Sequence, residues 1–152
     1  MLGRILLLVA LISESVAASE LYACAFTQGA VTELTVKASG SHFTEHRKVV
    51  EEAPLSFIFF AGDDGKGWVD SPKNTGSPVP TQVVRGRYPV LSFVEVTGMG
   101  NVNTTTIFRQ AGLGGTPELF MAVHSRHVLL IAGDTAAVSQ YTGACGPMKR
   151  KQ

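Results

Sequence analysis

The sequence has almost no excess of charge of either sign. Of its 152 residues, 13 are Lys or Arg and 12 are Asp or Glu, which leaves a formal net charge of +1. Because a protein that binds nucleic acid needs basic groups to neutralise phosphates, we expect no nucleic-acid partner. Charged residues make up only 16% of the chain against 45% hydrophobic residues, which excludes a disordered acidic or basic chain. The length suits one domain.

Long apolar runs are also missing, apart from one near the N-terminus. Arg4 is followed by an unbroken apolar run over 5–12, then by polar residues and by small residues that end at Ala18. This order predicts a secretory signal peptide, 1–18, cleaved between Ala18 and Ser19. The apolar run would form about 12 Å of helix, too short for a bilayer core of roughly 30 Å. We therefore expect a periplasmic or secreted chain with no transmembrane segment after cleavage.

Cysteine is scarce, since the chain has only Cys24 and Cys145. There is no Cys-x-x-Cys motif, so one disulfide in an exported chain is a better interpretation than a redox pair or a metal site. The bond would bring the first and last strands together, as in a closed barrel or a sandwich. Leu21-Tyr22-Ala23-Cys24 superficially resembles a lipoprotein box. Tyr22 is bulky where a small residue is usual, so lipid anchoring at Cys24 is the weaker interpretation.

Strand patterns dominate the chain after the signal segment. Residues 21–27 and 31–37 alternate with a period of two, and Gln28-Gly29 between them predicts a hairpin turn. Further strands are expected over 42–50, 55–60, 82–85, 90–96, 103–109, 118–124, 127–132 and 138–145. The sequence predicts one all-β domain over 19–148, an antiparallel sandwich or small barrel of about eight to ten short strands. A basic tail, 149–152, follows it.

The four histidines form two pairs in the sequence, His42 with His46 and His124 with His127. On strands, His42 and His46 share one face, whereas His124 and His127 point to opposite faces. One interpretation is a zinc or copper site built from three of them. The alternative is that they are polar residues at strand ends, hydrogen-bonded to water or backbone. No other cofactor is expected.

Other catalytic and metal motifs are weak. Ser41 beside His42 and Ser125 beside His124 are neighbours in sequence only, and the chain lacks the Gly-x-Ser-x-Gly motif of many hydrolases. Residues 62–70 superficially resemble a calcium loop. Glycines stand where oxygen ligands should be, which favours a plain hairpin turn.

Aromatic residues allow two interpretations. They could line a ligand cavity, as in barrels that bind small molecules, or fill the packed core, which the sequence favours. The residues concerned are Phe57, Phe59, Phe60, Trp68, Phe93, Phe108, Phe120 and Tyr141.

Three stretches carry a family resemblance: 104–107 (Thr-Thr-Thr-Ile), 122–127 (Ala-Val-His-Ser-Arg-His) and 139–145 (Ser-Gln-Tyr-Thr-Gly-Ala-Cys). Over roughly this C-terminal third, the chain is similar to small exported bacterial proteins of unknown function. The resemblance implies a bacterial periplasmic location and no particular activity.

These observations favour a soluble periplasmic β-protein that acts as a non-catalytic binding or interaction module. A small ligand or an envelope protein would be its partner. One alternative is a small exported metal-binding protein or hydrolase that uses the histidine pairs. A second alternative is a structural protein of the cell envelope.

Overall fold

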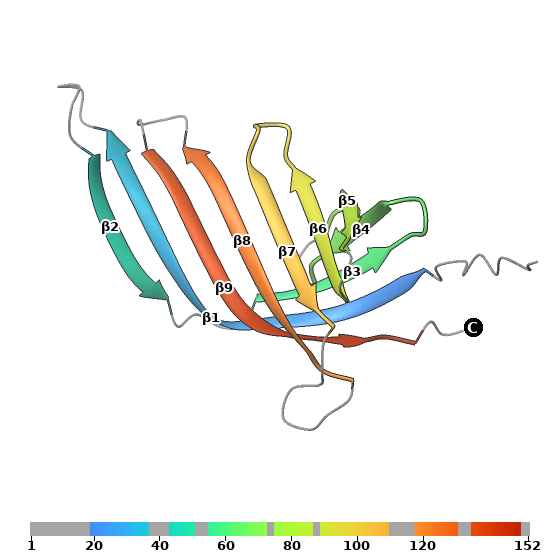
Figure 1. Ribbon diagram of the computed structural model, residues 1–152. Coiled ribbons are helices and arrows are strands. Elements are labelled where there is room, and N and C mark those ends of the chain that lie inside the picture. The colour runs from blue at the N-terminus through green and yellow to red at the C-terminus, as the bar shows by residue number, and fades with distance from the viewer. Residues whose placement is uncertain are drawn as a thin grey trace, which may run out of the picture.

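The computed structural model describes residues 19–36, 43–50, 55–72, 75–86, 89–109, 118–130 and 135–149. The predicted signal peptide, with Ala18, lies outside these ranges. The regular elements of the described ranges are all strands (Figure 1). They are β1 (Glu20–Val36), β2 (Phe43–Val50), β3 (Leu55–Ala61), β4 (Lys66–Asp70), β5 (Val79–Arg85), β6 (Val90–Val96), β7 (Val102–Phe108), β8 (Phe120–Leu130) and β9 (Thr135–Pro147).

The strands close into an antiparallel barrel. From β3 to β9 each strand pairs with the next along the chain, and β1 pairs with both β3 and β9. This makes a closed eight-stranded barrel that leaves β2 outside the ring. The predicted all-β antiparallel fold is therefore confirmed, and it is a barrel. The disulfide between Cys24 and Cys145 is confirmed as well, since these residues are bonded and lie opposite each other on β1 and β9.

One sheet continues beyond the barrel. The first part of β1 pairs with β3, while its second part, from Gly29 to Val36, pairs with β2. In Figure 1, β2 and the neighbouring ends of β1, β9 and β8 extend away from β3, β4 and β5. The predicted turn at Gln28-Gly29 is wrong, because β1 passes through it with a bulge between Phe26 and Gln28. Gly29 serves a different purpose there: a Cβ at this position would collide with the ring of Tyr141 on β9.

Several local predictions hold. Residues 62–65 form the plain turn of the hairpin between β3 and β4, closed by a 2.8 Å hydrogen bond from the Gly62 amide to the Lys66 carbonyl. Gly65 occupies the left-handed region, with φ of 76°. The strand expected over 42–50 is β2. The two strands expected over 118–124 and 127–132 differ from the structure, in which β8 runs through Ser125 and Arg126 as one strand.

The core lies at one end of the barrel. Pairing between strands places four inward side chains in one row, and none is more than 1% exposed. They are Leu91 on β6, Ile107 on β7, Ala122 on β8 and Phe26 on β1. We call this set the floor row. Because it is apolar and closely covered, it closes the interior below the site described next.

A polar cluster lies beyond the floor row. The hydroxyl of Tyr22 donates a hydrogen bond to the carboxylate of Glu20, and Nη1 of Arg109 lies 2.9 Å and 3.1 Å from the two oxygens of that carboxylate. Burial and then the contact with Glu20 raise the pKa of Tyr22 to about 12. The tyrosine therefore stays protonated, and the ion pair links β1 to the end of β7.

Candidate functional site: a cavity inside the barrel

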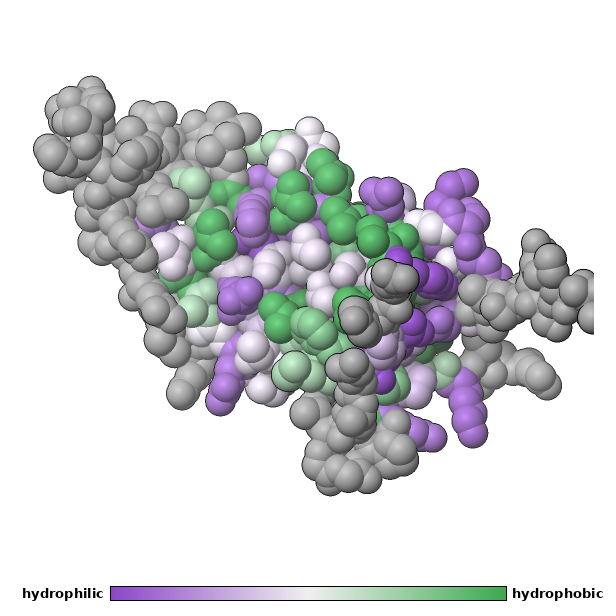
Figure 2. All heavy atoms as spheres, viewed as in Figure 1, coloured by the Kyte–Doolittle hydropathy of each residue, from purple (hydrophilic) through white to green (hydrophobic). Residues whose placement is uncertain are grey.

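The outside of the barrel is mixed in character. Figure 2 shows apolar side chains beside polar ones across one face of the molecule. Exposed large apolar residues such as Val96, Met99 and Met121 come from different strands and turns. Single exposed apolar residues are ordinary on protein surfaces. The interior therefore holds the clearer candidate site.

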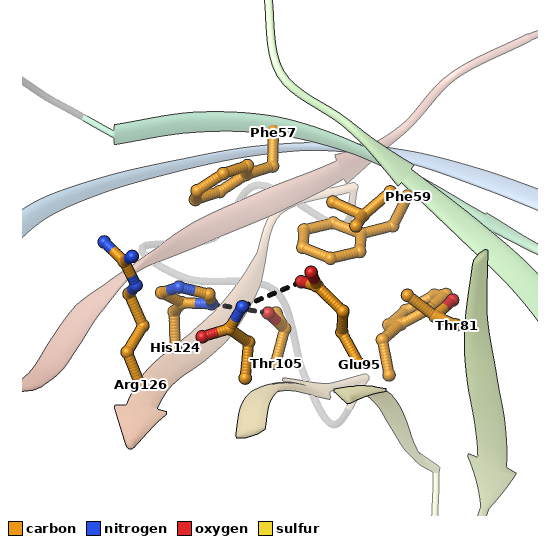
Figure 3. Close-up of a pocket in the computed structure, with 10 residues that line it drawn as sticks. Phe57, Phe59, Thr81, Glu95, Thr105, His124 and Arg126 are labelled. Carbon is orange, nitrogen blue, oxygen red and sulfur yellow. Dashed lines mark hydrogen bonds between the residues drawn. The ribbon is translucent and has the colours of Figure 1, made fainter. Parts of the chain in front are cut away.

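A cavity of about 200 Å³ lies above the floor row. Its apolar wall consists of Phe57, Phe59, Val69 and Phe93. Its polar wall consists of Thr81, Glu95, Asn103, Thr105, His124 and Arg126. Figure 3 shows the rings of Phe57 and Phe59 facing His124 and Glu95 across this space. Among the aromatic residues, Phe59 and Phe93 belong to the core, which the sequence favoured, and also face the cavity.

Two further rows of inward side chains follow the floor row. The middle row holds Phe93, Thr105, His124 and Tyr141 on β6, β7, β8 and β9. The rim row holds Glu95, Asn103, Arg126 and Ser139 on the same strands. Thr105 and His124 are buried, Glu95 and Asn103 are partly exposed, and Arg126 is exposed. On β6, β7 and β8 exposure therefore rises from floor to rim, whereas Ser139 on β9 is buried. The mouth of the cavity lies at Glu95, Asn103 and Arg126.

His124 is held neutral in the middle row. Its Nδ1 lies 2.8 Å from Oγ1 of Thr105, and its ring centroid lies 5.0 Å from that of Phe57. Burial, and then the positive charge of Arg126, lower the pKa of His124 to about 4. A histidine with so low a pKa is a weak general base near neutral pH, where catalytic bases are tuned close to the working pH. The contact with Thr105 is therefore better suited to positioning the ring than to activating a nucleophile.

Two polar atoms at the cavity are buried without a hydrogen-bond partner. They are Oγ1 of Thr81, whose side chain is only 8% exposed, and Oδ1 of Asn103. The other end of the Asn103 amide is satisfied, because Nδ2 donates to Oε2 of Glu95 at 2.8 Å. Buried polar groups are nearly always hydrogen-bonded, and leaving one unpaired costs about 1–3 kcal/mol. Both residues line the cavity, so a bound molecule could supply the missing partners.

The rim row carries two opposite charges. Glu95 and Arg126 stand on either side of Asn103, one on β6 and the other on β8. In the described part of the chain, the ion pairs are Lys66 with Asp64 and Arg109 with Glu20, so neither rim charge belongs to one. The mouth therefore offers one anionic and one cationic group to an entering molecule.

Of the two predicted histidines whose side chains are described, one lines the cavity. His124 faces the interior and His127, three residues further along β8, is exposed on the opposite face, as the strand alternation predicts. His42 lies outside the described residues. His46 lies across from Glu33 in the pairing of β2 with β1, but its side chain is not described. Among described residues, no group of three His, Cys, Asp or Glu could hold a metal ion. Because this excludes His42 and the side chain of His46, the histidine site stays a prediction.

Most of the residues that line the cavity were not predicted from the sequence. Thr81, Glu95, Asn103, Thr105 and Arg126 were not singled out as site candidates. Glu95, Asn103 and Thr105 lie on predicted strands, whereas Thr81 precedes the strand predicted over 82–85 and Arg126 lies between those predicted over 118–124 and 127–132. A signal was available for all of these except Asn103: each is a polar residue for which alternation puts an apolar residue two positions away on the same face.

Comparison with known proteins gives no family. No protein-family model, curated protein or solved structure matches this chain. The resemblance of the C-terminal third to small exported bacterial proteins therefore stays a prediction. Within the described ranges, no helix is long and apolar enough to cross a membrane. The disulfide is compatible with an oxidising location.

Proposed function

We propose that this chain is an exported protein that binds a small molecule inside its barrel without transforming it. The observation that carries the proposal is the pair of unpartnered buried atoms, Thr81 Oγ1 and Asn103 Oδ1, at an aromatic-walled cavity. A core that served packing alone would gain stability by losing these groups. Their presence is explained if a ligand pairs with them when it binds.

The size of the cavity limits the ligand. Its volume of about 200 Å³ equals that of about six or seven water molecules, at roughly 30 Å³ each. Sites for drug-sized molecules are larger, at about 300–1,000 Å³. The ligand is therefore a single-ring molecule or something of similar size, with an apolar part against Phe59 and Phe93.

Export is proposed on separate grounds. The signal pattern that ends at Ala18 predicts it, and the Cys24–Cys145 disulfide suits an oxidising compartment. Intact mass measurement on untagged protein recovered from a bacterial periplasm tests this part. A chain that begins at Ser19 and is two hydrogens lighter than its reduced form is expected. A chain that retains Met1 or carries an added lipid would contradict it.

A fragment screen by protein-observed NMR tests binding. We expect single-ring fragments to shift the amide signals of Thr105 and His124 in a saturable way. In the variant Thr81→Leu, whose longer side chain projects into the cavity, the same fragments should lose these shifts. Thr104→Leu is the matched control, because Thr104 is on the opposite face of β7 from Thr105. The proposal is refuted if no fragment binds at millimolar concentrations. It is also refuted if the fragments bind Thr81→Leu as they bind the wild type.

A further inference from the structure

We infer that the cavity selects ligands that carry a protonated amine next to an apolar body. This inference rests on the proposed function and names the ligand class. It draws on three features of the cavity: its unpaired acceptors, the unneutralised charge of Glu95, and the aromatic wall.

The amide of Asn103 is oriented so that its oxygen is left to accept. A carboxylate can only accept hydrogen bonds, so the neighbour of Glu95 Oε2 at 2.8 Å must be the nitrogen, Nδ2. Oδ1 then points away from Glu95, is buried, and has no partner among the described residues. A carbonyl oxygen cannot donate, so it needs a ligand that brings an N–H or O–H group.

Thr81 adds a second unpaired group on another wall. Its hydroxyl is buried, lines the cavity and lacks a partner. A hydroxyl can donate or accept, so it is compatible with an ammonium group as well as with an acceptor. Together with Asn103 it gives the ligand two neutral contact points on β5 and β7.

The carboxylate of Glu95 favours a ligand with a positive charge. Among the described residues, its carboxylate is hydrogen-bonded by Asn103 alone, and no cation is paired with it. An ammonium group there would receive charge-assisted hydrogen bonds, which are about twice as strong as neutral ones. The neutral form of His124 adds no opposing charge in the middle row near pH 7.

The aromatic wall also favours a cation. Phe57, Phe59 and Phe93 line the cavity, and the centroids of the Phe59 and Phe93 rings lie 4.8 Å apart. A cation within about 6 Å of a ring centroid is attracted by the ring quadrupole. The same rings accept the apolar body of the ligand.

Arg126 supports the competing class, a ligand with a carboxylate. Its guanidinium lies at the mouth and is exposed, so water screens its charge. A carboxylate drawn to it would bring only acceptors towards Asn103 Oδ1 and would meet the charge of Glu95. The interior therefore favours an amine, and a carboxylate ligand is an outcome that the experiment can detect.

Calorimetric titration with three matched probes tests the inference: benzylamine, benzyl alcohol and benzoate. In the full wild-type protein at neutral pH, we expect benzylamine to bind about tenfold more tightly than benzyl alcohol, or more. Glu95→Gln should remove this preference, so that benzylamine binds no more tightly than benzyl alcohol. Glu118→Gln is the control, because Glu118 is exposed just before β8, at the floor end of the barrel.

The outcomes separate the two proposals. If none of the probes binds and the fragment screen is also negative, the binding function itself fails. If benzyl alcohol binds as tightly as benzylamine, or if benzoate binds best, the cavity binds ligands but the amine inference is overturned. If Glu95→Gln does not fold, the wild type is titrated with both amine and alcohol at low and at high salt, which screens charge at the partly exposed mouth. A ratio of benzylamine to benzyl alcohol affinity that does not fall at high salt overturns the inference.

Discussion

Acid should destabilise this fold through His124. The side chain is 5% exposed, and burial, followed by the charge of Arg126, lowers its pKa from 6.5 to about 4. In the unfolded chain the imidazole should titrate near its ordinary value of about 6.5. Between these two pH values the unfolded chain holds the proton and the folded chain does not. The stability that neutral His124 contributes is therefore complete above about pH 6.5 and is lost as the pH falls towards 4.

The size of this effect follows from the two pKa values. One pKa unit corresponds to about 1.4 kcal/mol, and the values differ by about 2.5, so full titration removes about 3 kcal/mol. At pH 4.5, where titration is incomplete, the loss relative to pH 7 is about 2 kcal/mol. This is a large share of the 5–15 kcal/mol by which domains are typically stable.

Urea unfolding of the wild type and of His124→Gln at pH 7 and pH 4.5 measures the effect. Glutamine can still hydrogen-bond Thr105 but does not titrate, and the other acidic and basic groups are the same in both proteins. We expect the wild type to lose about 2 kcal/mol more than the variant between the two pH values. Equal losses, or an NMR titration that places the pKa of His124 near 6.5, would refute the reasoning.

Three further predictions concern stability. Reducing the Cys24–Cys145 disulfide should lower the free energy of unfolding by up to about 5 kcal/mol, because the bond closes a loop with a sequence separation of 121. In a thermal melt, Tm should fall by roughly 10–20 °C. Thr81→Val removes a buried hydroxyl without a partner and keeps the shape of the side chain, so Tm should stay the same or rise while benzylamine affinity falls. Gly29→Val should destabilise the protein by about 2 kcal/mol or more in urea unfolding, because its side chain would collide with the Tyr141 ring.

Matched variants give these measurements their controls. Thr104→Val changes the same residue type on the outer face of β7 and should leave benzylamine affinity unchanged. Gly98→Ala adds a Cβ where no atom lies within 4 Å and should be nearly neutral. An unchanged Tm after reduction, a Thr81→Val variant that is clearly less stable, or a Gly29→Val variant as stable as Gly98→Ala would each contradict the corresponding explanation.

The fold could be predicted from the sequence where single strands carry their own signal. Alternation on β1 correctly separated Cys24 and Phe26 from their outward neighbours, and two cysteines near the ends of the mature chain were enough to predict the disulfide. At Gln28-Gly29 the local pattern wrongly predicted a turn. A turn and a bulge favour the same residues, and only the pairing of β1 with β9 decides between them.

The candidate site was harder to predict because it depends on the register between strands. On β6, alternation places Leu91, Phe93 and Glu95 on one face, so the change from apolar to charged is visible in the sequence. β7 and β8 show the same change along their inward faces. What the sequence does not show is that these three strands are neighbours whose polar ends lie side by side. That alignment follows from long-range pairing.

The central claim is that a small ligand binds inside the barrel, and intermolecular NOEs measure this most directly. With ¹³C-labelled protein and unlabelled benzylamine, the account predicts NOEs from the ligand ring protons to Phe59 and Phe93 and from its methylene protons to Asn103. These NOEs should disappear in Thr81→Leu. NOEs confined to exposed residues such as Val96 and Met99, with none to Phe59 or Phe93, would contradict the claim.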